Sequence, residues 1–526
     1  MGLFKARKMG RFEIYMRDRF CGILLPVSSL PSAYGIGSFS EAAKEWIRFL
    51  KNSKQQYWQI LPLGPISYGD SPYQSFSTFA GNPLFIDLEK LIEDGLLSRE
   101  ACDQADLISD PSYVDYGKQY YHRYPLLYQA FENSDHESDP EFTEFCKKNK
   151  SWLHDYAVFM ACKDSHDGAP WTEWEPDLKK RKKAALQKVE EEEADRIRFY
   201  EYLQYLFSVQ WDEVRAYAKE NGISIIGDIP IYVALDSADV WTNPKLFQLD
   251  KNLDPVAVAG CPPDAFCEDG QLWGNPLYDW SFHKKTGYEW WISRIRHCSE
   301  LYDMVRIDHF RGFDEYYAVP FEEETARKGT WEPGPGMELF DLIKKEVPEL
   351  GIIAEDLGFI TDSVRKLVAD SGFPNMKVLQ FAFGSDSENE YLPNWYDENC
   401  VVYTGTHDNA TLMQFIAQMP GYERYHVEEY LNLHPDRNEA LSDGLIRLAL
   451  GSVARYCIIP MQDYLQLGAE ARINTPSTLG GNWEWRMSDW QMKDERLAEK
   501  IRYLCGLFGR FGHRIKEEEK ESSQDE

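Results

Sequence analysis

The chain is long and acidic: its 526 residues (61.2 kDa) carry a formal net charge of −30 at pH 7, and the sequence pI is about 4.8. That balance repels phosphate backbones and anionic lipid surfaces, so nucleic acid and membranes are not expected as partners. With 43% hydrophobic residues, the chain has enough apolar material for several domains or for one large barrel with insertions.

No apolar run reaches the roughly 18 to 20 residues of a membrane helix, and the longest early candidate, Cys21 to Leu30, is broken by Pro26. Residues 1–20 form a basic leader that no apolar signal-peptide core follows. The ten cysteines are scattered singly, and the closest pair is Cys261 and Cys267. Free thiols in a reducing compartment explain this better than a disulfide framework, and we expect a cytoplasmic protein.

The first elements alternate between strand and helix. A short apolar strand begins at Cys21, and a helix from Ser40 to Lys51 follows, with Ser40 as its N-cap. A second strand covers Tyr57 to Leu63. Strand, helix and strand in this order indicate a parallel α/β arrangement.

The alternation then stops for about 158 residues, from 64 to 221. Asn82 to Asp87 is predicted to be a short extended piece, and most of the rest is predicted to be helical. The charged run from Lys179 to Glu193 is best explained as the solvated face of a helix. We interpret 64–221 as an inserted subdomain that covers one side of a pocket.

Six more apolar segments complete the pattern, with a second, loop-rich insertion at about 235–287. They are Ile223–Val233, Met304–Asp308, Gly351–Glu355, Lys377–Phe383, Val401–Thr406 and Arg455–Met461. Eight strands separated by helices predict an α/β fold, a (β/α)8 TIM barrel with large insertions around its mouth. The barrel is expected to be one catalytic domain over 21–515, and the acidic tail 516–526 is expected to be disordered. The interval of 47 residues from Asp308 to Glu355 is predicted to contain one step from strand to strand with a loop.

Charged residues stand at the ends of several predicted strands. Met304–Asp308 is an apolar run that ends in charge, and Arg306 and Asp308 should share one face of it. In a barrel of this type the carboxyl ends of the strands line the active site. The residues expected there are Asp228, Asp308, Glu355, His407 and Asp408.

Clustered carboxylates suit either a divalent metal or glycosyl transfer. The chain has no His-x-His or dense Asp run at a strand end, so a metal site is the weaker hypothesis. Glycosyl transfer needs one ionised and one protonated carboxyl group. Asp308, close to Arg306, is the better anion, whereas Glu355 follows Ile352, Ile353 and Ala354 and is the better acid.

Each residue also has a structural interpretation. Asp228 could belong to a turn or cap a helix, and His407-Asp408-Asn409 could cap the next helix. Glu355 could be an ordinary acidic strand end, and Trp273 could be a core residue. The functional interpretation is favoured because these residues fall at the same end of one predicted barrel.

Several segments resemble the signature regions of the 4-α-glucanotransferases called amylomaltase or disproportionating enzyme, glycoside hydrolase family 77 of the α-amylase clan. The resemblance covers about Gly22 to Gly506 and is highly specific. Its motifs are Asp228–Val233, Arg306–Gly312, Ala354–Gly358, Gly405–Asn409, Tyr68–Ser75, Gly270–Leu277, Arg472–Pro476 and Gly481–Trp483.

The resemblance implies a retaining mechanism with three catalytic carboxylates: Asp308 as nucleophile, Glu355 as general acid/base and Asp408 as stabiliser of the transition state. It implies no cofactor. Maltooligosaccharides and other α-1,4-glucans are the implied substrates, with glucose among the acceptors. The implied substrate-binding residues are Tyr68, Asp228, Trp273, Arg306, His407 and Asn482.

The chain departs from the family pattern at one position in these motifs. Ser477 follows Pro476, where the family commonly has glycine, and this affects the loop before Asn482. A hydrolase of the same clan and a glucan-binding protein without turnover are the alternative functions. The intact set of three carboxylates argues against the second of these.

Overall fold

The computed structural model describes residues 18–67, 69–263 and 268–512. Most of the predicted leader and the whole predicted tail lie outside these ranges. Eight parallel strands close into a barrel in the order β1-β12-β11-β10-β9-β6-β3-β2, which confirms the predicted fold. The strands are β1 (Phe20–Leu24), β2 (Tyr57–Gln59), β3 (Ser224–Pro230), β6 (Met304–Asp308), β9 (Gly351–Ala354), β10 (Asn375–Val378), β11 (Cys400–Tyr403) and β12 (Tyr456–Pro460).

Alternation along β6 separates the inside of the barrel from its outside. Val305 and Ile307 belong to the large core that packs the barrel against its helices. Met304 belongs to a smaller apolar cluster contributed by seven of the barrel strands, which fills the interior. Because side chains alternate along a strand, Arg306 and Asp308 point inward above Met304, as predicted.

Four strands end three or more residues earlier than the sequence pattern predicted. β3 ends at Pro230 and β11 at Tyr403, each three residues before the predicted end. The segment predicted as a strand from Lys377 to Phe383 begins at Asn375 and ends at Val378, and Leu379–Phe381 then forms a 3₁₀ helix. β2 ends at Gln59, four residues before the predicted end. Apolar residues continue past the ends of β2 and β10, because the chain stays buried there without staying extended.

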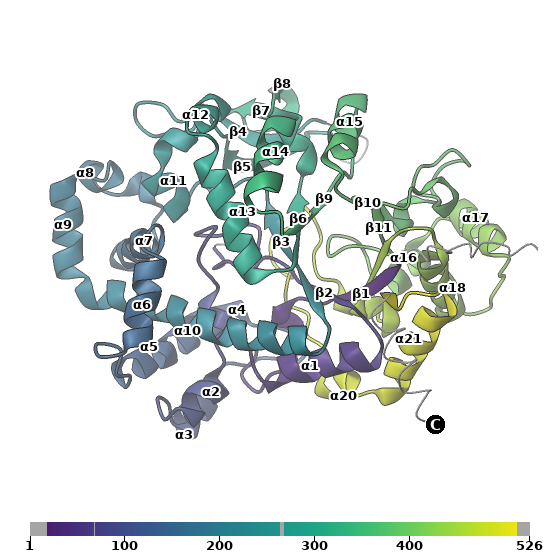
Figure 1. Cartoon of the computed structure of the whole chain (residues 1–526), viewed down its shortest axis with the longest axis horizontal. Coiled ribbons are helices and arrows are strands. Elements are labelled where there is room, and N and C mark those ends of the chain that lie inside the picture. The colour runs from purple at the N-terminus through teal and green to yellow at the C-terminus, as the bar shows by residue number, and fades with distance from the viewer. Residues whose placement is uncertain (1–17, 68, 264–267, 513–526) are drawn as a thin grey trace, which may run out of the picture.

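The chain between β2 and β3 is mainly helical and lies to the left of and below the barrel in Figure 1. The predicted extended piece at Asn82–Asp87 is wrong: Pro83–Phe85 is a 3₁₀ helix capped by the Asn82 side chain. The charged run forms α8 and α9, whose side chains are largely exposed. The helices here are α2 (Leu88–Glu93), α3 (Arg99–Gln104), α4 (Tyr116–Lys118), α5 (Tyr124–Glu132), α6 (Pro140–Lys148), α7 (Leu153–Ser165), α8 (Pro176–Lys179), α9 (Lys183–Glu192) and α10 (Ala194–Glu220).

A second, four-stranded antiparallel sheet was not predicted. Its order is β5-β4-β7-β8, and it lies at the top of Figure 1. The region around 235–287, predicted to be loop-rich, supplies two of its strands. The interval from Asp308 to Glu355 supplies the other two and a helix, so it is more than one strand-to-strand step with a loop. The strands are β4 (Ala257–Cys261), β5 (Gln271–Pro276), β7 (Glu315–Pro320) and β8 (Thr330–Pro333).

The remaining helices pack around the barrel and its insertions. α1 (Glu41–Asn52) begins after Ser40, whose side chain accepts a hydrogen bond from the Ala42 N–H, as predicted. The others are α11 (Ala238–Thr242), α12 (Trp280–Lys285), α13 (Glu289–Leu301), α14 (Met337–Glu346), α15 (Asp362–Ser371), α16 (Leu412–Gln418), α17 (Gly421–Leu431), α18 (Asn438–Gly451), α19 (Met461–Tyr464), α20 (Asp489–Met492) and α21 (Glu495–Leu507).

Two general features concern the environment of the protein. Among the helices of the described residues, none has the length and apolarity needed to span a bilayer. The described part of the chain contains nine cysteines, none of which forms a disulfide.

Candidate active site

An arginine joins two carboxylates at the carboxyl ends of β3 and β6. Arg306 donates through Nη1 to both oxygens of Asp228, at 2.9 and 2.7 Å, and through Nη2 to Oδ1 of Asp308, at 2.8 Å. Asp228 is fully buried, whereas the Asp308 side chain is 32% exposed. The carboxylate of Asp228 is therefore held inside the barrel, whereas the carboxylate of Asp308 reaches the mouth.

Asp228 sits in register with Arg306 on the neighbouring strand, so it is neither a turn nor a cap residue. Burial raises the pKa of Asp228 to about 6; the guanidinium of Arg306 works against this rise and the charge of Asp308 adds to it. Desolvation alone would protonate this carboxyl group, and the arginine is what favours its ionised form.

Glu355 follows β9 and is held by two backbone N–H groups. The N–H of His309 donates to its Oε2 at 2.6 Å, and the N–H of Leu357 donates to its Oε1 at 2.8 Å. Only 8% of the residue is exposed. Burial, and then the charge of Asp308, raise the pKa of Glu355 to about 7, although Arg306 and the two N–H groups oppose the rise. This carboxyl group can carry a proton at neutral pH.

His309 is the residue that links the strand of Asp308 to Glu355. Its φ of 53° is left-handed, which ends β6 and begins the 3₁₀ helix Phe310–Phe313. Its ring meets the indole of Trp273 edge-on, with ring centroids 4.7 Å apart. Trp273 itself lies on β5 and is half-buried, so the second sheet brings this predicted substrate-binding residue to the barrel mouth.

Asp408 follows β11 and has its own partners. Nδ2 of Asn474 donates to Oδ1 of Asp408 at 2.6 Å, and Nε2 of His407 lies 3.3 Å from Oδ2. Burial alone would raise the pKa of Asp408, but the charge and hydrogen bond of His407 and the hydrogen bond of Asn474 lower it below its ordinary value. Burial is the largest influence on the pKa of His407 and lowers it, but the charge and hydrogen bond of Asp408 and the charge of Asp228 together raise the pKa above its ordinary value.

The helix-capping interpretation of His407-Asp408-Asn409 is not what the structure shows. Helix α16 is capped by Thr411. Asn409 instead accepts hydrogen bonds from the N–H and hydroxyl of Thr406, at 2.8 and 2.9 Å, within the turn that presents His407 and Asp408.

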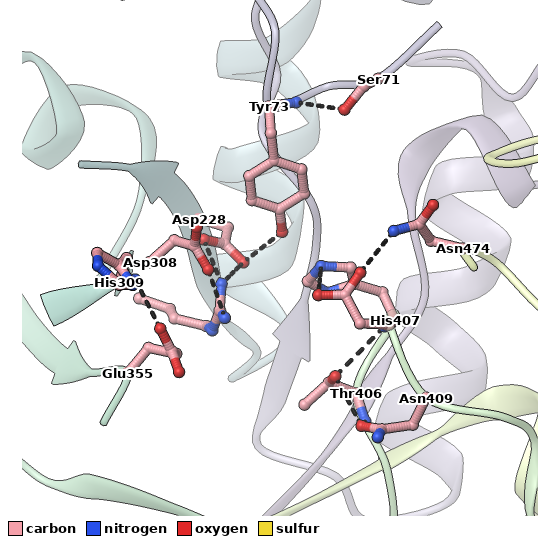
Figure 2. Close-up of polar contacts among 12 residues, drawn as sticks. Ser71, Tyr73, Asp228, Asp308, His309, Glu355, Thr406, His407, Asn409 and Asn474 are labelled. Carbon is pink, nitrogen blue, oxygen red and sulfur yellow. Dashed lines mark hydrogen bonds and ion pairs between the residues drawn. The ribbon is translucent and has the colours of Figure 1, made fainter. Parts of the chain in front are cut away.

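Tyr73 connects the residues around Asp228 with those around His407. No role was predicted for it from the sequence. In Figure 2 its ring lies between Asp228 on one side and His407 on the other. Its hydroxyl donates to Oδ2 of Asp228 at 2.9 Å, and its ring stacks on His407 with centroids 5.1 Å apart. Asn474 was missed in the same way. Both residues lie within segments that resemble the family, Tyr68–Ser75 and Arg472–Pro476, and this position in a motif is the sequence feature that could have identified them.

The two remaining predicted substrate-binding residues have different outcomes. Tyr68 lies outside the described residues. Asn482 is buried, and its side-chain amide forms hydrogen bonds within its own loop. Its Oδ1 accepts from the N–H of Thr475 at 2.8 Å, and its Nδ2 donates to the carbonyl of Thr478 at 3.2 Å. Its substrate contact stays a prediction. The next residue, Trp483, places its ring 5.8 Å from those of Tyr73 and His407.

Fold and site together define a class of protein: a (β/α)8 enzyme whose mouth carries an acid protonatable near pH 7 beside an arginine-paired carboxylate. That pairing suits acid-assisted displacement at an acetal carbon. Comparison with known proteins is more specific. Residues 25–493 match the family described as 4-alpha-glucanotransferase, glycoside hydrolase family 77.

Known relatives agree along nearly the whole chain. The 4-alpha-glucanotransferase of Clostridium butyricum is 47% identical over 487 residues, which cover 92% of this chain and 99% of the relative. The Thermus thermophilus enzyme of that name is 44% identical over 493 residues, covering 91% and 97%. The crystal structure of Streptococcus agalactiae amylomaltase in complex with acarbose superposes with a TM-score of 0.91 at 38% identity, covering 94% of this chain and 100% of that one.

This chain belongs to the 4-alpha-glucanotransferase family, which confirms the resemblance. It has 4-alpha-glucanotransferase activity on α-1,4-glucans and is a glycosyltransferase acting on hexosyl groups. Transfer is thus favoured over the hydrolase and the non-catalytic alternatives.

Proposed function

We propose that the chain moves segments of maltooligosaccharide by a retaining double displacement, with Asp308 as nucleophile, Glu355 as general acid/base and Asp408 as stabiliser of the transition state. One observation carries the proposal: a buried Glu355 with a pKa of about 7 lies beside a half-exposed Asp308 that is paired with Arg306. The other contacts of the site support the roles given below.

In the first displacement the carboxyl proton of Glu355 passes to the glycosidic oxygen as the C1–O bond breaks. A carboxylate oxygen of Asp308 forms a bond to C1, which gives a covalent β-glucosyl-enzyme and releases the aglycone as an alcohol. The charge of Arg306 keeps Asp308 in its nucleophilic, ionised form.

In the second displacement Glu355, now a carboxylate, takes the proton from the 4-hydroxyl of an acceptor glucose or glucan. The hydroxyl oxygen attacks C1, the bond to Asp308 breaks, and the α configuration is restored. Asp408, ionised through His407 and Asn474, stabilises the positive charge that C1 and the ring oxygen carry between these states.

Substrate binding falls to polar and aromatic groups around these three carboxylates. Asp228, Arg306 and His407 are proposed to contact the sugar bound at the cleavage point. Trp273, Tyr68 and Asn482 are proposed to lie along the glucan path. The half-buried ring of Trp273 supports a stacking role, whereas the loop contacts of Asn482 favour a role in shaping that path.

The choice between an acceptor sugar and water is proposed to rest with the insertions around the mouth. Tyr73 comes from the loop after β2 and Trp273 from the second sheet, so both insertions reach the catalytic residues. Segments that cover a site exclude water and hold the acceptor in position.

The proposal is tested by incubating the enzyme with maltotriose and resolving the products by size. Transfer yields glucose and a ladder of longer maltooligosaccharides, while the number of reducing ends stays nearly constant. A steady rise in reducing ends would instead establish hydrolysis as the main reaction. Free glucose added to maltohexaose should shorten the ladder, because glucose then competes as acceptor.

The nucleophile is tested by Asp308→Asn, which should abolish turnover with little effect on the fold because the side chain reaches the barrel mouth. Unchanged far-UV circular dichroism is the control. More than a small residual fraction of wild-type activity would contradict the assignment.

The protein is further proposed to work in the cytoplasm. The nine cysteines without disulfides in the described part of the chain suit a reducing compartment. Fractionation of the producing cell into cytoplasmic, membrane and exported material tests this, and recovery outside the cytoplasmic fraction would refute it.

A further inference from the structure

A second cleft, of about 340 Å3, lies between α7 of the helical insertion and the α11 to α13 region. Figure 1 shows α7 beside α11, to the left of the barrel. None of the proposed catalytic or substrate-binding residues lines this cleft. Its volume falls within the range of small-molecule binding sites.

Four partly exposed aromatic side chains line the cleft, Phe79, Trp152, Phe282 and Trp290, together with the buried Tyr156. All four are half-buried, so part of each ring is open to solvent. The rings of Phe79 and Trp152 are nearly parallel, with centroids 6.3 Å apart and an interplanar angle of 18°, and Trp290 meets Phe79 at 87°. Large aromatic side chains are often partly exposed, and the exposed faces of these four rings offer stacking surfaces.

Neutral polar groups accompany the rings. Hydroxyl or amide groups come from Thr242, Asn243, Thr286 and Ser293, and Asn243 and Ser293 are exposed. Such groups both donate and accept hydrogen bonds, as sugar hydroxyls require. No lysine or arginine is among the residues that line this cleft, which disfavours an anionic ligand.

Two of the carboxylates at the cleft already have partners. Arg181 donates to Asp155 at 2.5 Å, and Asp239 accepts from the N–H and hydroxyl of Thr78 at 2.8 and 2.7 Å. Arg181 therefore compensates the charge of Asp155, and Asp239 is hydrogen-bonded within the protein, which leaves Glu289 as the exposed carboxylate at the cleft. This weakens the case for an organic cation, which aromatic rings and free carboxylates would otherwise recruit.

We propose that this cleft is an accessory binding site for an α-1,4-glucan chain. None of the residues that line it is one of the proposed catalytic carboxylates. Exposed ring faces bind the apolar faces of glucose units, and the flanking hydroxyls and amides bind their edges. The identity of the ligand rests on the proposed function, whereas the existence of the site rests on the cleft alone. A glucan held there stays on the enzyme, which raises its local concentration.

The test uses Asp308→Asn protein, which should bind glucan without turning it over, and isothermal titration with maltoheptaose. We expect two sites in Asp308→Asn and one site after Trp152→Ala is added. Trp152→Phe, which keeps a smaller ring, should weaken the second site about tenfold. Trp490→Ala is the matched control, because that tryptophan is 70% exposed on α20 and does not line the cleft.

Activity separates this proposal from the proposed function. With Asp308 intact, Trp152→Ala should keep wild-type kcat and KM on maltotriose, which also shows that it folds. A single binding site in Asp308→Asn, or two sites that both survive Trp152→Ala, would overturn the accessory site and leave the proposed function standing. Displacement of maltoheptaose from the second site by tetramethylammonium at equal concentration would overturn the choice of a neutral sugar. No binding at all by Asp308→Asn, together with no ladder from the wild type, would instead count against the proposed function.

Discussion

If Glu355 is the general acid, as proposed, its proton sets the pH range in which the enzyme can cleave an unactivated glucan. A glutamic acid with the ordinary pKa of 4.5 would be protonated in about one molecule in 300 at pH 7. A pKa of about 7 leaves about half of the molecules protonated. The difference corresponds to about 3 kcal/mol of interaction free energy, most of it from burial and the charge of Asp308.

Because the acid must be protonated, kcat/KM for maltotriose should fall tenfold for each pH unit above about 7. α-Maltosyl fluoride is the informative second donor, since fluoride leaves without a proton. Its glycosylation step should be nearly independent of pH from 6 to 9. The assay is initial-rate kinetics with each donor over that range, with circular dichroism at every pH as the control for folding.

His407 offers the competing explanation, since its raised pKa could also produce a basic limb. It contacts Asp408 rather than the leaving group, so its deprotonation should slow both donors alike. A basic limb shared by maltotriose and the fluoride would therefore refute the assignment to Glu355. Glu355→Gln gives a second check: it should lose the maltotriose reaction while still releasing fluoride.

Three further changes have defined outcomes. Tyr73→Phe removes the donor to Asp228 and should lower kcat/KM by about 10- to 100-fold. It should also lower the melting temperature, because a hydrogen bond to a charged group contributes about 1.5–3 kcal/mol to stability. Full activity would deny Tyr73 a role. Asn474→Ala removes a hydrogen bond that lowers the pKa of Asp408, so this pKa should rise in the variant. As the pH is lowered, the variant should therefore lose activity at a higher pH than the wild type does. An acid limb of the pH profile at the wild-type position would contradict this. Ser477→Gly should raise the melting temperature slightly. The left-handed φ of 63° costs serine about 1–2 kcal/mol, whereas the larger loss of backbone entropy on folding costs glycine about 0.5–1 kcal/mol. A lower melting temperature for the variant in a thermal melt would refute this.

The barrel could be predicted from sequence because its strands are buried on both faces. Continuous apolar runs such as Gly351–Ala354 stand out against helices of different period, and eight apolar strands in a row leave few architectures. The second sheet escaped because its central strands, β4 and β7, pair with each other across more than 50 residues of intervening chain, and its outer strands, β5 and β8, are partly exposed. Periodicity within a window cannot detect such pairing.

For the site, position on a strand was the informative feature. Arg306 and Asp308 share a face because side chains alternate, and this needs no knowledge of other strands. The raised pKa of Glu355 could be foreseen in direction from its apolar neighbours. Its two backbone donors could not, because one of them depends on the left-handed turn at His309.

Tyr73 and Asn474 show what local reasoning leaves out. Tyr73 follows β2 and meets Asp228 on the neighbouring β3, and Asn474 follows β12 and meets Asp408 after the neighbouring β11. The stacking of Tyr73 on His407 is the contact that depends on closure of the barrel through β1, which pairs with both β2 and β12. Tyr73 contacts Asp228 and His407, which belong to different sides of the mouth, and so fixes the two sides relative to each other. The carboxylates alone supply the chemistry, but their relative placement depends on a loop far away in the sequence. Substitutions in the loop that carries Tyr73 should therefore lower kcat more than they raise KM, because misplacing catalytic groups weakens the transition state more than substrate binding.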